Sequence, residues 1–133
     1  MMNKPMFSNV DCIELYVSSL EEGIRFYCEG LGLSLLWKGA TSAGLGMPEG
    51  KTEVVLQTER RQMNVDFLVE DVEKAVLDYG KAGGTVVHPP FDIPIGKCAV
   101  VRDMWNNQYV ILDMTKGAYQ TDDEGNITGV VKK

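Results

Sequence analysis

The sequence predicts an α+β protein made of two similar modules, each with the element order β-α-β-β-β. Three observations lead to this prediction. A strand-and-helix pattern that begins at Val10 returns 52 positions later, so that Leu15 is matched by Phe67. Each copy opens with alternating apolar and polar residues, which is the period of a half-buried strand. Each copy then changes to apolar residues three and four positions apart, which is the period of an amphipathic helix.

The first strand of the first module is predicted over Val10–Val17. Because side chains alternate along a strand, Cys12, Glu14 and Tyr16 share one face. After the strand, Ser19 stands three residues before Glu22, the spacing of a capping box that starts a helix.

The apolar stripe of this first helix contains four residues, Leu20, Ile24, Tyr27 and Leu31. Glycines end the helix, at Gly30 and Gly32. Three segments then follow as predicted strands: Leu33–Lys38, a weak strand or hairpin within Ala40–Gly50, and Thr52–Thr58. The first module is thus complete before a polar bridge, Glu59–Gln62.

The second module repeats the order with a strand over Met63–Val69 and a helix capped by Asp71. Its helical stripe contains Val72, Ala75, Val76 and Tyr79, and Gly83–Gly84 ends the helix. A short strand, Thr85–Val87, is expected to be broken by Pro89–Pro90, which places His88 in a loop. The last two strands are Lys97–Arg102 and Tyr109–Met114, with a turn at Met104–Asn107 between them. In the tail, the turn residues Asp123–Asn126 followed by Ile127–Val131 indicate either an added hairpin or a mobile end.

Length and composition are those of one compact globular domain, residues 1–133, with modules at about 8–58 and 63–115 and a tail at 116–133. The sequence has no apolar run long enough to cross a membrane and no apolar signal core at its start, so a cytoplasmic protein is expected. Three widely spaced cysteines, Cys12, Cys28 and Cys98, are typical of reduced thiols. A net charge of −6 argues against nucleic acid as a partner.

The chain resembles the vicinal oxygen chelate superfamily, which includes glyoxalase I, bleomycin-resistance proteins and extradiol dioxygenases. The stretches that carry the resemblance in the first module are Leu15–Leu20, Phe26–Tyr27 and Leu31–Leu33. Those in the second module are Val69–Val72, Gly83–Val87, Pro90–Lys97, and Val101–Asp103 before Asn107. The resemblance covers about Val10 to Thr115. It implies a curled mixed sheet around a cavity with the helices on the outside, a homodimer, and, in the family's metalloenzymes, a divalent ion in the cavity.

The positions at which the family holds its metal do not carry the usual ligands in this sequence. The two first-strand histidines fall on Cys12 and Asn64, and the final carboxylate falls on Val110. The remaining ligand falls on Glu53 or Gln57. Asn is a weak ligand, and Val has no donor atom. The divalent metals nickel, zinc, iron and manganese favour imidazole and carboxylate ligands. The residues therefore predict no metal site and no cofactor.

Two alternatives remain open around the carboxylates Glu14 and Asp66, which occupy equivalent positions in the two modules. Together with the Cys12 thiolate they would hold a soft divalent metal. By themselves they would form a general acid/base pair, if a dry cavity separates their pKa values. In the simplest reading they are polar groups of a pocket, or ion-pair partners of Arg25 or Arg102.

The predicted function is a metal-free, dimeric protein that binds and sequesters a small molecule, similar to the bleomycin-resistance branch. The residues favour this over an enzyme, and the two acidic groups favour a cationic or aromatic ligand. The first alternative is a metal-dependent lyase, isomerase or dioxygenase with a non-standard ligand set. The second is a non-catalytic interaction or regulatory module. The expected ligand-binding residues are Cys12, Glu14, Tyr16, Trp37, Asn64, Asp66, Leu68, Val110 and Leu112.

Overall fold

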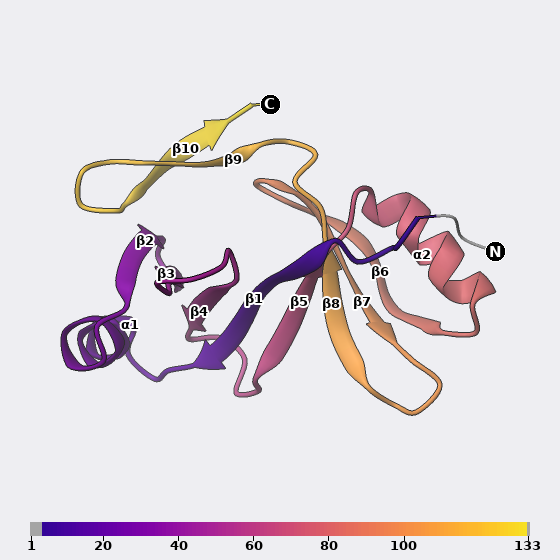
Figure 1. The fold of residues 1–133 in the computed structure, drawn as a ribbon, viewed down its shortest axis with the longest axis horizontal. Helices are drawn as coiled ribbons and strands as arrows, with labels where there is room; N and C mark the ends of the chain where they lie inside the picture. Colours follow the sequence, from indigo (N-terminus) through magenta and orange to yellow (C-terminus); the bar gives the residue numbers. More distant parts are fainter. Residues whose placement is uncertain (1–3, 133) are drawn as a thin grey trace. The chain divides into compact units, whose positions relative to one another are not determined.

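The structure is a computed structural model that describes residues 4–132. Within these residues the chain forms two α-helices, one π-helical segment and ten strands. Eight strands belong to a mixed sheet that is not closed, and the last two form a sheet of their own. Each module has the order β-α-β-β-β (Figure 1), so the α+β class and the repeat predicted from the sequence are confirmed.

The chain divides into two compact units. The first-module unit consists of Asp11–Val65 together with the tail segment Tyr119–Gly129. The second-module unit consists of Asp66–Ala118, together with the N-terminal residues up to Val10 and the residues from Val130 onward. The tail is therefore shared between the two units. That the chain is a single domain stays a prediction.

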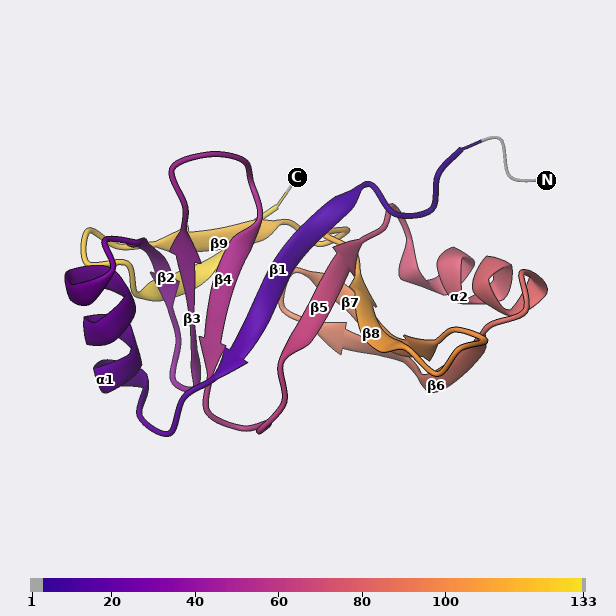
Figure 2. The same ribbon diagram turned by 60° about the horizontal axis from the view of Figure 1, so that its bottom comes forward.

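The first module contains four strands of the large sheet in the order β2-β3-β4-β1. Figure 2 shows these four strands side by side. β1 is parallel to β4, and the other neighbouring pairs are antiparallel. The elements are β1 Asn9–Tyr16, α1 Leu20–Ile24, the π-helical segment Arg25–Gly30, β2 Ser34–Lys38, β3 Ser42–Gly46 and β4 Glu53–Gln57.

The first helix starts where the capping box predicts, since the Ser19 hydroxyl accepts a hydrogen bond from the backbone N–H of Glu22 at 3.3 Å. After one α-helical turn the backbone widens into the π-helix Arg25–Gly30. A π-helical turn takes more residues than an α-helical turn, so the apolar stripe loses its phase. Leu31, predicted to be buried, is 56% exposed. The expectation for Leu31 was therefore wrong.

The second module contains strands in the order β5-β8-β7-β6, with α2 against them. Its elements are β5 Asn64–Leu68, α2 Val72–Lys81, β6 Thr85–Ile93, β7 Gly96–Arg102 and β8 Gln108–Leu112. Asp71 caps α2 through Lys74 N at 3.1 Å, as predicted. The hydrophobic core of this module joins the helix to the sheet and consists of Val69, Val72, Ala75, Tyr79, Ala99, Val101 and Ile111.

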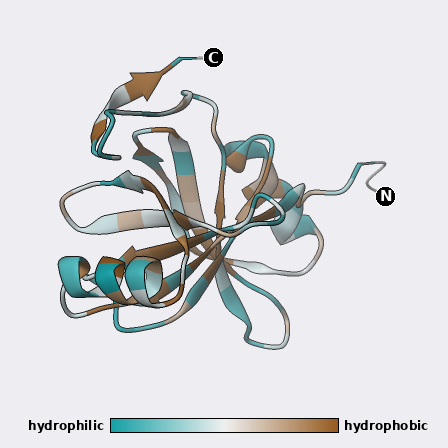
Figure 3. Cartoon of the chain, turned by 60° about the vertical axis from the view of Figure 1, so that its left-hand side comes forward, coloured by the Kyte–Doolittle hydropathy of each residue, from teal (hydrophilic) through white to brown (hydrophobic). Residues whose placement is uncertain are grey.

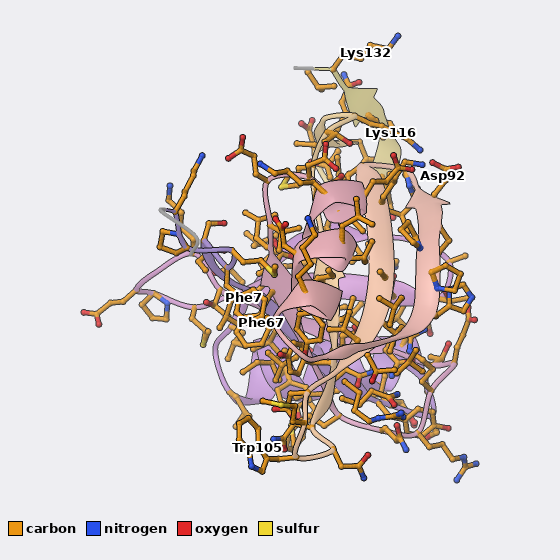
Figure 4. All side chains as sticks on the ribbon, turned by 90° about the vertical axis from the view of Figure 1, so that its right-hand side faces the viewer. Phe7, Phe67, Asp92, Trp105, Lys116 and Lys132 are labelled. Atoms are coloured by element: carbon orange, nitrogen blue, oxygen red, sulfur yellow. The ribbon has the colours of Figure 1, made fainter. Side chains whose placement is uncertain are left out.

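Aromatic residues extend this core toward the N-terminal segment. Phe7 stacks on Phe67 with ring centroids 4.3 Å apart, and Figure 4 shows the two side chains next to each other. The Tyr79 and Tyr109 hydroxyls form a hydrogen bond at 2.7 Å, so Tyr109 faces the helix. In Figure 3 the hydrophobic residues follow the strands, including β10 near the C-terminus.

β6 is longer than the sequence predicted. Instead of ending at Val87, it continues through Pro89–Pro90 to Ile93, and His88 lies within the strand opposite Val100. Register shifts on both sides of His88 mark bulges. Because β6 is the last strand in the order, it tolerates prolines that cannot donate to a ladder. The predicted break at the prolines and the predicted loop around His88 were therefore wrong.

A buried carboxylate ties α2 to the sheet. Asp113 is 1% exposed and accepts hydrogen bonds from the backbone N–H of Val72 at 2.8 Å and of Lys97 at 3.0 Å. The Thr115 hydroxyl donates to the same carboxylate at 2.8 Å. A Cβ on Gly96 would lie 2.3 Å from the Asp113 carboxylate, so this position requires glycine. The carboxylate therefore satisfies backbone donors at the start of α2, where the helix dipole also favours negative charge.

The tail forms a hairpin of β9 Ala118–Thr121 and β10 Ile127–Val131, one of the two outcomes that the sequence left open. In its turn, Asp122 accepts hydrogen bonds from the backbone N–H of Glu124 and of Asn126, both at 2.9 Å. Asp103 makes the same bonds to Trp105 and Asn107 in the turn between β7 and β8. In residues 4–132, no helix has the length and apolar character needed to cross a bilayer.

Candidate functional site

One face of the first-module sheet gathers most of the predicted site residues of that module. The parallel register of β1 and β4 sets Cys12 opposite Glu53, Glu14 opposite Val55 and Tyr16 opposite Gln57. Side chains of parallel partners point to the same side of a sheet, so these residues line one face. Of the two candidates for the remaining family ligand, Glu53 is the one opposite Cys12, while Gln57 is opposite Tyr16. Which of them corresponds to that ligand stays a prediction.

Trp37 lies across this face from β2. Its indole Nε1 donates a hydrogen bond to Glu53 Oε1 at 2.7 Å. Between them on β3 is Gly44, where a Cβ would lie 2.0 Å from Trp37 Nε1 and 2.7 Å from Glu53 Oε1. Only a residue without a side chain allows the indole and the carboxylate to meet there. Gly44 therefore builds the site, whereas the sequence indicated only a weak strand or hairpin within Ala40–Gly50.

Two carboxyl groups on this part of the sheet have raised pKa values. Burial raises the pKa of Glu53, the hydrogen bond from Trp37 partly opposes this shift, and the charge of Asp11 adds to it. Burial also raises the pKa of Asp11, against a lowering hydrogen bond from Cys12. The like charge of Asp11 disfavours the ionised form of Glu53. A cation placed beside Glu53 would favour that ionised form.

The tail hairpin adds a second aromatic ring to the site. Tyr119, on β9, lies against Trp37 with ring centroids 5.1 Å apart and planes tilted by 43°. The hairpin is fastened to β2 by a hydrogen bond from Lys38 N to Gly125 O at 2.7 Å and by a bridge between Lys38 and Asn126. Trp37 is thus held between the Glu53 carboxylate and the Tyr119 ring.

The bridge between the modules returns to β1 with two arginines. Arg60 Nη2 forms an ion pair with Glu14 Oε1. The guanidinium carbon of Arg61 lies 5.3 Å from the centre of the Tyr16 ring, a cation–π arrangement. The sequence had offered Arg25 or Arg102 as partners of the carboxylates. That expectation was wrong for Glu14, and Arg25 instead pairs with Glu29 on its own helix.

In the second module, the expected ligand-binding residues form a matching row. Asp66 is opposite Val110 and Leu68 is opposite Leu112, in the parallel register of β5 and β8. Asp66 and Leu112 are buried, and Asn64 is half-buried at the start of β5. Next along the sheet, Val100 and Cys98 of β7 pair with Val110 and Leu112. This face is mostly apolar. The role of Glu14 and Asp66 as an acid/base pair stays a prediction.

Three site residues were missed from the sequence: Arg60, Arg61 and Tyr119. The two arginines looked like part of a solvated bridge, and Tyr119 belongs to a tail without any periodic pattern. A signal for Arg60 existed, because a buried carboxylate on a strand needs a partner nearby. The sequence nevertheless did not show that the bridge folds back along β1.

The fold and this face define a class of protein: an α+β chain of two βαβββ modules with polar groups at matched strand positions. The chain belongs to the Glyoxalase/Bleomycin resistance protein/Dioxygenase superfamily, whose family model matches residues 9–111. The resemblance seen in the sequence is thereby confirmed. No curated protein matches the chain.

Solved structures share the fold at low sequence identity. Methylmalonyl-CoA epimerase from Mycobacterium tuberculosis is 14% identical with a TM-score of 0.71, over 85% of this chain and 92% of that chain. The Mn(II)-bound glyoxalase from Novosphingobium aromaticivorans is 14% identical with a TM-score of 0.60, over 81% and 39%. A variant of homoprotocatechuate 2,3-dioxygenase from B. fuscum is 22% identical with a TM-score of 0.59, over 83% and 33%. At these identities the likeness shows the fold alone.

The donor groups at the family's metal positions do not form a complete ligand set. Asn64 offers a weak neutral oxygen, and Val110 offers no donor. Glu53 already accepts the Trp37 indole N–H. Cys12 and Glu14 are both buried, and their thiol and carboxylate donor atoms lie within 4.8 Å of each other, but the Glu14 carboxylate already pairs with Arg60. The residues at the family's metal positions therefore do not supply the imidazole and carboxylate ligands that nickel, zinc, iron or manganese favours.

Proposed function

We propose that the chain is a small-molecule-binding protein of this superfamily that works without the family's divalent metal and sequesters a cationic aromatic compound. The observation that carries the proposal is the engagement of two carboxylates of the first-module face by the protein's own groups, Glu53 by the Trp37 indole and Glu14 by Arg60. In this proposal the carboxylates and the rings of Trp37 and Tyr119 recognise the ligand.

The distribution of charge supports a cationic ligand. The first-module unit contains eleven acidic and five basic residues, so it carries the whole net charge of −6. The second-module unit contains eight of each. An excess of negative charge raises the local concentration of cations and speeds their association.

Ligand binding that is independent of metal is the expected result. The chain, stripped with EDTA, is titrated with a panel of aromatic cations that includes bleomycin, by calorimetry and thermal shift. At a hundredfold excess over Kd, a true ligand stabilises the folded chain by about 2.7 kcal/mol. Zinc, nickel and manganese should leave the Tm unchanged. A stoichiometric ion in the purified protein, with binding lost in EDTA, would contradict the proposal.

A metal-dependent lyase, isomerase or dioxygenase is the second candidate. It is favoured by Cys12 and Glu14, two buried residues whose thiol and carboxylate donor atoms lie within 4.8 Å of each other. For this candidate, turnover should appear on addition of metal and disappear in both Cys12→Ala and Glu14→Ala. Glu73→Gln, an exposed carboxylate on α2, is the matched control and should retain the activity.

We also propose that the chain forms a homodimer. An exposed apolar tip supports this proposal, because Met104 is 64% and Trp105 is 74% exposed at the turn between β7 and β8, where Figure 4 shows Trp105 at the end of the turn. Light scattering after size exclusion should give twice the mass of the chain, 14.7 kDa. A mass of one chain at all concentrations would exclude the dimer.

A further inference from the structure

The bridge between the modules is clamped against the first-module sheet by a buried amide. Gln57, at the end of β4, is 3% exposed. Its Oε1 accepts hydrogen bonds from the backbone N–H of Glu59 at 2.8 Å and of Arg60 at 2.7 Å, while its Nε2 donates to Arg60 O at 2.5 Å. These bonds fix the backbone of the bridge in one conformation. The positions of Arg60 and Arg61 beside β1 are thus set by the fold.

The ion pair between Arg60 and Glu14 is unequal in exposure. The Glu14 side chain is 7% exposed, whereas that of Arg60 is 56% exposed. A carboxylate this deeply buried needs a cationic partner, because leaving it alone in the interior is costly. The arginine, in contrast, is largely hydrated already and loses little when it turns toward solvent. Arg60 can therefore be replaced by another cation, but Glu14 cannot be left without one.

The neighbouring arginine makes the same kind of contact. Arg61 lies over the Tyr16 ring, and Tyr16 is two residues beyond Glu14 on the same face of β1. Residues two apart in a strand are separated by about 6.6–6.8 Å. Two guanidinium groups of the chain therefore contact neighbouring residues of this face, one a carboxylate and the other an aromatic ring. Both of these are residues expected to bind the ligand.

We propose that Arg60 is an internal stand-in for the ligand's own cation, and that the ligand carries a guanidinium or amidinium group that replaces Arg60 on Glu14. This inference rests on the proposed function and specifies the chemistry of its ligand. A planar fork of N–H donors matches a carboxylate in a way that an ammonium does not. A flat part of the same ligand takes the place of Arg61 on Tyr16.

Removing the stand-in should open the site to a guanidinium from solution. Arg60→Ala is expected to lower the Tm, because Glu14 loses its partner. Titration with methylguanidinium chloride in the millimolar range should then raise the Tm of the variant by several degrees and reach saturation. Ethylammonium chloride at the same concentrations should restore less, since it lacks the fork. In Glu14→Gln/Arg60→Ala, methylguanidinium should have no such effect.

Arg25→Ala is the matched control, because it removes an arginine from the exposed pair with Glu29, whose side chains are 64% and 75% exposed. Methylguanidinium should not raise its Tm. Equal responses of Arg60→Ala and Arg25→Ala, or equal rescue by ethylammonium, would overturn the inference. If Arg60→Ala does not fold alone, recovery on refolding is compared in the two salts. Recovery in methylguanidinium but not in ethylammonium supports the inference. Equal recovery in the two salts, or no recovery in either, contradicts it.

This outcome is separable from that of the proposed function. The rescue uses methylguanidinium alone on a variant, whereas the ligand panel uses the unaltered chain. If the rescue fails while a compound of the panel binds, the inference that the ligand carries a guanidinium group is overturned. The proposal that the chain binds a small molecule is then unaffected. Successful rescue while no compound in the panel binds supports the site on Glu14 and counts against sequestration of aromatic cations.

Discussion

Asp113→Ala should destabilise the second-module unit by about 3 kcal/mol or more, because it leaves several buried donors without an acceptor. The donors are the backbone N–H groups of Val72 and Lys97 and the hydroxyl of Thr115. Denaturant titration followed by circular dichroism measures the change. Asp92→Asn is the control, since Asp92 is an exposed carboxylate near the same strand that bridges Lys97 and Lys116. The control should have little effect, and equal losses in the two variants would contradict the role of Asp113.

The loss of stability caused by Asp113→Ala should depend on pH. Burial raises the pKa of Asp113. The hydrogen bonds from Val72, Thr115 and Lys97 together lower it by more than burial raises it, so the pKa lies below its usual value. A carboxyl with a lowered pKa in the folded state stabilises the fold above the pKa of the unfolded chain, about 3.9. That stabilisation is lost as the pH falls through the folded-state pKa. The difference in unfolding free energy between the natural chain and Asp113→Ala should therefore narrow below about pH 4.

Gly44→Ala should displace the Trp37 indole from Glu53, because the new Cβ would lie 2.0 Å from Trp37 Nε1. Overpacking of this kind costs about 1–3 kcal/mol. The larger consequence is for the site, since the indole loses its hydrogen bond and its position against Tyr119. In a Trp105→Phe background Trp37 is the only tryptophan, so its emission should shift to longer wavelength. Affinity for an aromatic cation should fall about tenfold or more, which corresponds to about 1.4 kcal/mol.

Gly46→Ala is the matched control for this prediction. Gly46 lies two residues further along β3, and the nearest atoms that a Cβ there would meet belong to the Leu36 side chain, at 3.2 Å. Leu36 is half-exposed and can yield. The control should keep the emission of Trp37 and the affinity for the ligand. If Gly44→Ala kept both as well, the indole–carboxylate pair would not be part of the site.

The sequence predicted most of the fold because its signals are local. The capping residues Ser19 and Asp71, the alternation along β1 and the positive φ of Asn106 are each decided within a few residues. The failures have physical causes that are not local. The π-helix that exposes Leu31 has no signal in the residue pattern, and the extension of β6 through Pro89–Pro90 depends on its place at the end of the strand order.

The site was predictable only in part, for a related reason. Cys12, Glu14 and Tyr16 follow from alternation on one strand, and Trp37 was named because it is aromatic. Their partners come from distant positions: Arg60 is 46 residues from Glu14, and Tyr119 lies in the tail. Gly44 shows its purpose only once Trp37 and Glu53 are both placed. Pairings of this kind are set by topology, which the residue pattern does not display.

The attachment of the tail to β2 also bears on how an edge of the large sheet is protected. β2 is the last strand on its side of the order, and such edges offer unsatisfied backbone groups to other chains. The hairpin occupies part of this edge through the Lys38–Gly125 hydrogen bond. A chain shortened to the family-matched region, residues 9–111, would lose the hairpin that covers this edge. It would present an open strand with Leu36 on it, which is a template for edge-to-edge aggregation.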